Sequence, residues 1–206
     1  MKKLAICSFI VVVTCVTGAN AAGLLGTDYV GFSAGIMEYT DTSVLDTGFN
    51  LQGLANFNLT NFLDAQIGGS YMTVDGQLHT GRTYDYTAYT LSGGLVAFMD
   101  PIGNMRPFAN ASVGYVDKDN SMSSVSNDTA FYLGGGMEIE WTEQWLTQIG
   151  LNAVKIDDDE FGQADLMLGW WMKENVLLNV RSNIGFAGEE GTDFVAVLMG
   201  ANIMLK

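Results

Sequence analysis

Polar and apolar residues alternate with a period of two along most of this chain, and this pattern limits the possible folds most strongly. In segment 49–59, apolar residues such as Phe49 and Phe57 take the odd positions, whereas Asn50 and Asn56 take even ones. A β-strand directs successive side chains to opposite faces, so the alternation predicts strands with one apolar and one polar face. No stretch keeps a helical period, which argues for an all-β protein.

The same alternation recurs and predicts about ten strands, with eight as the alternative. Most of them are long enough to cross a membrane, since a tilted strand needs about 9–11 residues to do so. The expected strands are 29–39, 48–59, 63–74, 84–98, 106–117, 129–141, 145–156, 163–172, 176–186 and 193–205.

The connections between these strands alternate in length. Short turns lie at 60–62, 100–104, 142–144 and 173–175. Longer polar loops lie at 40–47, 75–83, 118–128, 157–162 and 187–192. Short turns on one side and long loops on the other are typical of outer-membrane barrels, in which they face the periplasm and the exterior.

Composition separates a membrane barrel from a soluble one. Only 16% of the residues are charged, whereas a typical soluble domain carries about 25%. Aromatic residues gather at the two ends of the strands, as in the girdles of membrane barrels. The expected girdle at the short turns is Phe57, Phe62, Phe98, Trp141, Trp145, Trp170 and Trp171, and that at the long loops is Tyr39, Phe49, Tyr71, Tyr84, Tyr86, Tyr115, Phe131, Phe186 and Phe194. We therefore predict a transmembrane antiparallel up-and-down β-barrel.

The N-terminus has the pattern of a secretion signal. Two lysines precede a short apolar run, and the small residues Ala19-Asn20-Ala21 follow it. An anchor helix would need about 20 apolar residues, more than this run offers. We expect residues 1–21 to be a cleaved signal peptide and residues 22–206 to form a single barrel domain.

Cysteine usage and charge exclude several classes of function. Cys7 and Cys15 both lie within the expected signal, so the mature chain would have no disulfide and no thiol. The chain carries 9 basic and 23 acidic residues, and loss of Lys2 and Lys3 leaves 7 − 23 = −16. So acidic a chain offers no basic face, and nucleic-acid binding is not expected.

Two segments resemble a known group of proteins. Segment 106–115 has Pro107-Phe108 directly after its first residue and ends with Gly114-Tyr115, and segment 134–138 is three glycines followed by Met137 and Glu138. Both are similar to strands of small Gram-negative outer-membrane β-barrel proteins of the porin-family or opacity-like group. The resemblance implies an outer-membrane location and folding by the barrel-assembly machinery. Many members end in an aromatic residue that this machinery reads, and here we expect Leu205 to take that place.

Side-chain parity predicts a set of charges inside the barrel. Charges in a confined interior must pair or stay hydrated. We expect pairs between Arg106 and either Glu138 or Glu140, and between Arg181 and Asp165. The set can either brace the barrel or select ions. Its members are Asp64, Arg106, Glu138, Glu140, Asp165 and Arg181.

No catalytic or metal-binding motif stands out. His79 is the only histidine and has no His-x-Ser element around it, which favours a solvated loop residue. The acidic run 157–160 fails the EF-hand template, because Phe161 takes a ligand position and Leu168 replaces the bidentate glutamate. We therefore expect no catalytic residues, no bound metal and no cofactor.

Three functions are consistent with these observations. We favour a non-enzymatic outer-membrane barrel that is either structural or a narrow, cation-favouring passive pore. The alternative is a surface interaction module whose acidic loops bind a partner, or lipopolysaccharide through divalent cations. A lipid-acting outer-membrane enzyme is the third hypothesis, which the single histidine disfavours.

Overall fold

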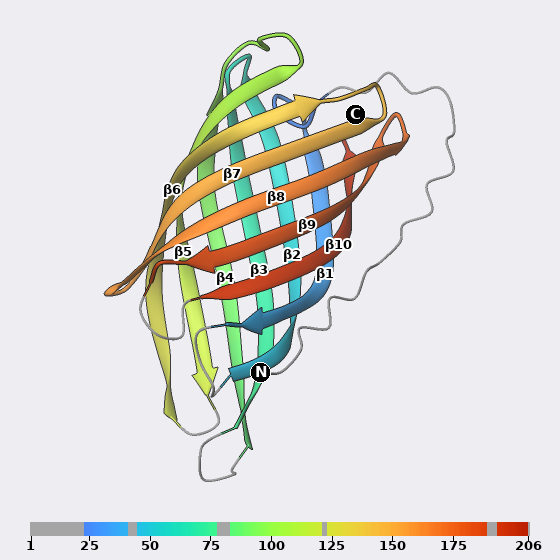
Figure 1. The fold of residues 1–206 in the computed structure, drawn as a ribbon. Coiled ribbons are helices and arrows are strands. Elements are labelled where there is room, and N and C mark those ends of the chain that lie inside the picture. Colours follow the sequence, from blue (N-terminus) through green and yellow to red (C-terminus); the bar gives the residue numbers. More distant parts are fainter. Residues whose placement is uncertain (1–22, 41–44, 78–82, 121–122, 189–192, 206) are drawn as a thin grey trace.

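A computed structural model describes residues 23–40, 45–77, 83–120, 123–188 and 193–205. Within these residues the chain forms ten strands that wrap into one tilted barrel (Figure 1). The strands are β1 (Tyr29–Tyr39), β2 (Leu45–Thr60), β3 (Leu63–Gln77), β4 (Thr83–Phe98), β5 (Met105–Asn120), β6 (Ser123–Glu140), β7 (Trp145–Ile156), β8 (Asp159–Lys173), β9 (Val176–Phe186) and β10 (Phe194–Met204). No helix in the described part of the chain is long and apolar enough to cross a membrane.

The barrel closes between its first and last strands. Every strand pairs with its neighbour in the chain, and β1 also pairs with β10, from Tyr29 opposite Met204 to Tyr39 opposite Phe194. All pairings are antiparallel, so the fold is an up-and-down barrel, as predicted. Closure satisfies the backbone groups that an open edge would leave unpaired in lipid.

Several strands are longer than the alternation predicted. β5 and β6 continue through most of the expected loop 118–128, and the Lys118 ammonium lies 2.8 Å from an Asp128 carboxylate oxygen in this extension. The expected loop 157–162 is reduced to a tight turn in which Asp157 has φ 56°. Strands that extend beyond the bilayer have water on both faces, so they need no apolar alternation and are missed by it.

The apolar face of the strands is on the outside. Ile36, Leu133 and Leu151 from three different strands all point away from the barrel, with 63%, 68% and 61% of their surfaces exposed. The alternate residues of a strand point inward. On β2, Asn50 and Asn56 are buried and line the interior cavities. A soluble protein does not expose so extensive an apolar surface, whereas a lipid bilayer covers it.

The two ends of the barrel differ, and we name them by their connections. The short-turn end carries the turn from Thr60 to Leu63, the start of β1 and the end of β10. The long-loop end carries the β5–β6 hairpin.

Candidate functional site: the barrel interior

The chain segment before β1 closes the short-turn end from inside. We call residues 23–28 the floor segment. Leu24 is 1% exposed and packs with Tyr29, Leu146 and Trp171. Leu25 is also buried, in a second apolar cluster on the opposite wall. Two leucines thus fill the space where the expected lumen charges lie. The adjacent apolar pair, bracketed by Gly23 and Gly26 just after the expected cleavage site, was the sequence signal for this segment.

Glu138 on β6 holds the first part of the floor segment. Its Oε2 atom accepts hydrogen bonds from the backbone N–H of Leu24 at 3.0 Å and of Leu25 at 3.4 Å. Gln148 Nε2 donates to the same oxygen at 2.7 Å. A buried carboxylate requires such donors, since its burial without them is costly.

Asp64 on β3 holds the next residue. Asp64 is completely buried, and its Oδ2 atom accepts from the Gly26 N–H at 2.9 Å and from Asn56 Nδ2 at 3.0 Å. Asn58 Nδ2 donates to Oδ1 at 2.9 Å. Asn56 also donates to the Thr27 carbonyl at 2.7 Å, so the segment is fixed through both its donors and its acceptors.

Arg106 on β5 completes the set. Its guanidinium donates to the Leu25 carbonyl at 2.6 Å and lies 5.8 Å from the centre of the Phe98 ring. Three of the six expected lumen charges therefore bind the floor segment. The fourth, Glu140, approaches the same segment, since a methyl group built on Gly23 would lie 2.7 Å from its Oε1 atom.

The expected ion pairs between lumen charges do not form. Among the described residues, the two ion pairs within 4.0 Å are Lys118–Asp128 and Lys155–Glu160. Arg106 faces Glu138 in the β5–β6 register, but both groups are directed to the floor segment instead. Strand parity carries no information on a non-strand segment that competes with the ion pairs for these side chains.

Arg181 and Asp165 lie farther from the short-turn end, and they form no ion pair with each other within 4.0 Å. Asp165 accepts from Asn152 at 2.6 Å, from Gln163 at 2.7 Å and from Asn183 at 2.5 Å. Arg181 donates over longer distances, to Asn179 at 3.3 Å and to Asn202 at 3.5 Å. Amide side chains thus satisfy the carboxylate, whereas the two hydrogen bonds of the guanidinium to described residues are long.

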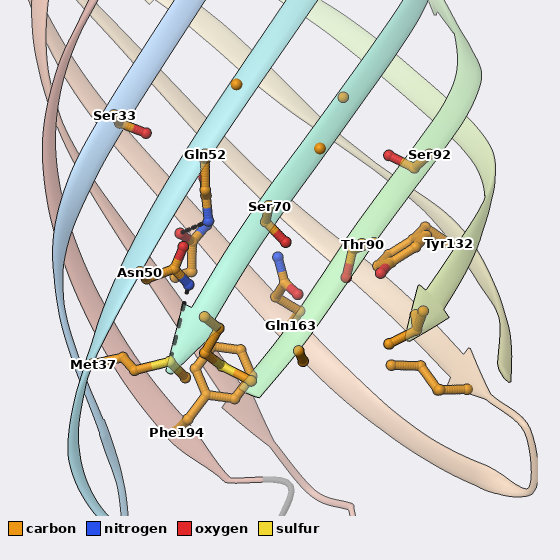
Figure 2. A pocket seen from close by; sticks show the side chains of 18 of the residues that line it. Ser33, Met37, Asn50, Gln52, Ser70, Thr90, Ser92, Tyr132, Gln163 and Phe194 are labelled. Atoms are coloured by element: carbon orange, nitrogen blue, oxygen red, sulfur yellow. Dashed lines mark hydrogen bonds between the residues drawn. The ribbon is translucent and has the colours of Figure 1, made fainter. Parts of the chain in front are cut away.

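A cavity of about 430 Å³ occupies the interior toward the long-loop end. We call it the outer chamber. Figure 2 shows Ser33, Gln52, Ser70, Thr90 and Ser92 projecting into it from four successive strands. Apolar side chains such as Met37 and Phe194 also line it, so its wall mixes hydrogen-bonding and apolar groups.

Two further cavities continue the path toward the short-turn end. The inner chamber holds about 240 Å³ and shares three lining residues with the outer chamber, namely Leu54, Arg181 and Asn183. The turn-side cavity holds about 210 Å³ and opens beyond the floor segment. Leu25 is the residue that lines both the inner chamber and the turn-side cavity, so the floor segment lies between them at this position.

Several expected girdle aromatics face inward instead. Phe98 and Trp171 are buried in the two clusters that receive Leu25 and Leu24. Tyr86 and Phe194 line the outer chamber. The sequence prediction considered only the position of these rings along the barrel axis. Strand parity decides whether a ring faces the interior or the lipid. Trp141 does lie outside, where it is 61% exposed.

The acidic turn 157–160 is the remaining sequence candidate within the described residues. The Asp157–Glu160 turn pairs Glu160 with Lys155 at 2.7 Å on the surface. Within the described residues, no group of three His, Cys, Asp or Glu side chains is placed to hold a metal ion. His79 and the expected signal 1–21 lie outside the described residues.

Comparisons with known proteins extend only to the fold. No protein-family profile and no curated protein matches the sequence. An outer-membrane channel from Pseudomonas putida F1 is similar in structure, with 12% identity and a TM-score of 0.53 over 93% of this chain and 100% of the channel. The translocator domain of the autotransporter NalP from Neisseria meningitidis has 6% identity and a TM-score of 0.53 over 87% of this chain and 88% of the domain.

The closed antiparallel sheet and the apolar exterior agree with these similarities. An exterior of this kind contacts membrane lipid, and a closed barrel is the form in which strands can span a bilayer. The chain is therefore a β-barrel of the outer-membrane type, with its interior closed at one end by its own floor segment.

Proposed function

We propose that this protein is a non-enzymatic, narrow passive channel of the outer membrane that favours cations and rests with its short-turn end closed. The observation that carries this proposal is the series of three cavities along the barrel axis. The outer and inner chambers meet at Arg181, and Leu25 lines both the inner chamber and the turn-side cavity. A barrel that served only as a structural element would not need such a series.

The charge distribution supports the cation preference. The six lumen charges comprise four acids and two bases. At the long-loop end, Asp157, Asp158 and Glu160 are exposed around the tight β7–β8 turn. Acidic groups around a narrow path attract cations and repel anions, and the effect falls as salt screens it.

Conductance in a planar bilayer tests the channel. We expect the mature chain to conduct weakly, with a reversal potential that shows cation preference in a KCl gradient. Leu25→Ala should raise the conductance, because it removes side-chain atoms that line both the inner chamber and the turn-side cavity. Leu133→Ala is the matched control, since that side chain faces lipid. Anion preference, or equal conductance of wild type and Leu25→Ala, would contradict the proposal.

The same acidic turn supports the expected contact with the outer leaflet. Lipopolysaccharide is anionic, so we propose that it reaches Asp157 and Asp158 through bridging calcium or magnesium. Assembly by the barrel-assembly machinery, with Leu205 as the terminal apolar residue, belongs to the same proposal. Chelation of divalent ions should weaken co-purification of lipopolysaccharide, and an unchanged yield would argue against the bridge.

A further inference from the structure

Three buried polar atoms around the floor segment have no hydrogen-bond partner among the described residues, namely Glu138 Oε1, Asn56 Oδ1 and Arg106 Nε, and Glu138 Oε1 is the carboxylate oxygen among them. Glu138 is 1% exposed, and its Oε2 atom accepts three hydrogen bonds, but its Oε1 atom accepts none. A buried carboxylate oxygen without a donor costs free energy. A missing donor is therefore indicated at this point of the structure.

The unpartnered oxygen is directed at the start of the floor segment. A methyl group built on Gly23 would collide with Glu138 Oε1 and would lie 2.7 Å from Glu140 Oε1. Gly23 is itself buried. Two carboxylates therefore converge on the backbone at Gly23, and glycine is the residue that leaves room for them.

No cation among the described residues neutralises this carboxylate pair by direct contact. Arg106 is the nearest base in the register, directly opposite Glu138, but it donates to the Leu25 carbonyl and forms no ion pair within 4.0 Å. Two acidic groups beside each other repel unless a positive group lies between or beside them. The chemistry of the site thus calls for a compact cation with several N–H donors.

The expected signal cleavage would supply such a cation at the required place. Cleavage after Ala21 leaves an α-ammonium group on Ala22, which is bonded directly to Gly23. Bond geometry keeps this nitrogen within about 5.3 Å of the Gly23 Cα atom, because successive Cα atoms are about 3.8 Å apart and N–Cα is about 1.5 Å.

We propose that Glu138 and Glu140 form a binding site for the α-ammonium group of the mature chain, so that removal of the signal peptide creates the charge that locks the floor segment. The inference rests on the expected cleavage site and deepens the proposed function, because it assigns what holds the channel closed. In the uncleaved chain the same nitrogen is a neutral peptide N–H, so the two carboxylates lack their counter-ion.

Selective acetylation of the mature chain tests the site. The α-amine titrates at about 7.7–8.0 and lysine at about 10.4, so acetylation of unfolded chain near neutral pH modifies the terminus and spares the lysines. The modified and unmodified chains are refolded in detergent, and their urea midpoints are compared. We expect acetylation to lower the midpoint of the wild-type barrel.

A double-mutant cycle shows whether the lost partner is Glu138. Acetylation should lower the midpoint of Glu138→Gln by much less than that of wild type, since the charge pair is already absent. Glu143→Gln is the matched control, because Glu143 is an exposed acid in the neighbouring turn, and acetylation should affect it as it affects wild type. If Glu138→Gln does not fold, Glu140→Gln replaces it in the cycle.

The outcomes separate this inference from the channel proposal. No effect of acetylation on wild type, or an equal effect on wild type and on the Glu138 and Glu140 variants, would overturn the ammonium site. The readout is stability and not conductance, so the ammonium site can fail while the channel proposal stands, and the reverse also holds.

Discussion

Arg106 and Glu138 face each other across the β5–β6 ladder, and both direct their charged atoms to the same short segment before β1. Arg106 donates to the Leu25 carbonyl at 2.6 Å, and Glu138 accepts from the Leu24 N–H at 3.0 Å. The two opposite charges thus hold the carbonyl and amide sides of one peptide segment. We call Arg106 and Glu138 the clamp, because together they hold the floor segment in place.

Removing the guanidinium of Arg106 should weaken the attachment of the floor segment to the barrel wall. A hydrogen bond to a charged group contributes about 1.5–3 kcal/mol, so Arg106→Gln should lower the unfolding free energy by about that amount. Urea denaturation of the refolded barrel measures the change. Lys173→Gln, an exposed base at the same end, should remain within about 0.5 kcal/mol of wild type. Equal losses in both variants would argue against the clamp.

Asp64→Asn should destabilise the barrel although it preserves shape. Asp64 accepts from three N–H donors, whereas the amide of asparagine would present a donor to at least one of them. Leaving a buried donor unsatisfied costs about 1–3 kcal/mol. The thermal or urea midpoint should fall, and Asp100→Asn in an exposed turn should leave it unchanged. A midpoint for Asp64→Asn equal to that of wild type would show that the site tolerates a donor.

Leu24→Ala should create a cavity inside the short-turn end. Leu24 is buried among Tyr29, Leu146 and Trp171, and loss of a buried leucine side chain typically costs about 2–5 kcal/mol. Leu151→Ala removes the same atoms from the lipid-facing surface and should cost clearly less. Comparable losses in the two variants would mean that the floor segment contributes little to stability.

Arg181→Ala should change conduction more than stability. Its hydrogen bonds are 3.3 and 3.5 Å long, and Asp165 is already satisfied by three amides, so the unfolding free energy should fall by less than about 1 kcal/mol. Loss of a positive charge between the two chambers should raise cation conductance and shift the reversal potential toward the cation limit. Arg181→Lys should resemble wild type in selectivity. A large stability loss with unchanged selectivity would contradict the placement of this charge on the conduction path.

The strands and their inward and outward faces were predictable because a lipid-facing barrel imposes alternation residue by residue, as in Phe49 and Asn50. The floor segment was not predictable by the same means, because residues 23–28 form no strand and their partners are set by which backbone groups reach Glu138 and Asp64. The inward position of Trp171 also follows from side-chain direction along a strand. Trp170 and Trp171 are adjacent, so one of them had to face the interior whatever their common height.

The floor segment is attached to the barrel by the bond between Asp28 and Tyr29, at the start of the strand that closes the sheet. A blocker that is covalently tethered acts at a fixed effective concentration set by its short linker. The closed fraction should therefore be independent of how many copies the membrane holds, unlike occlusion by a separate protein. Opening and reclosing become unimolecular events, with rates set by the clamp alone.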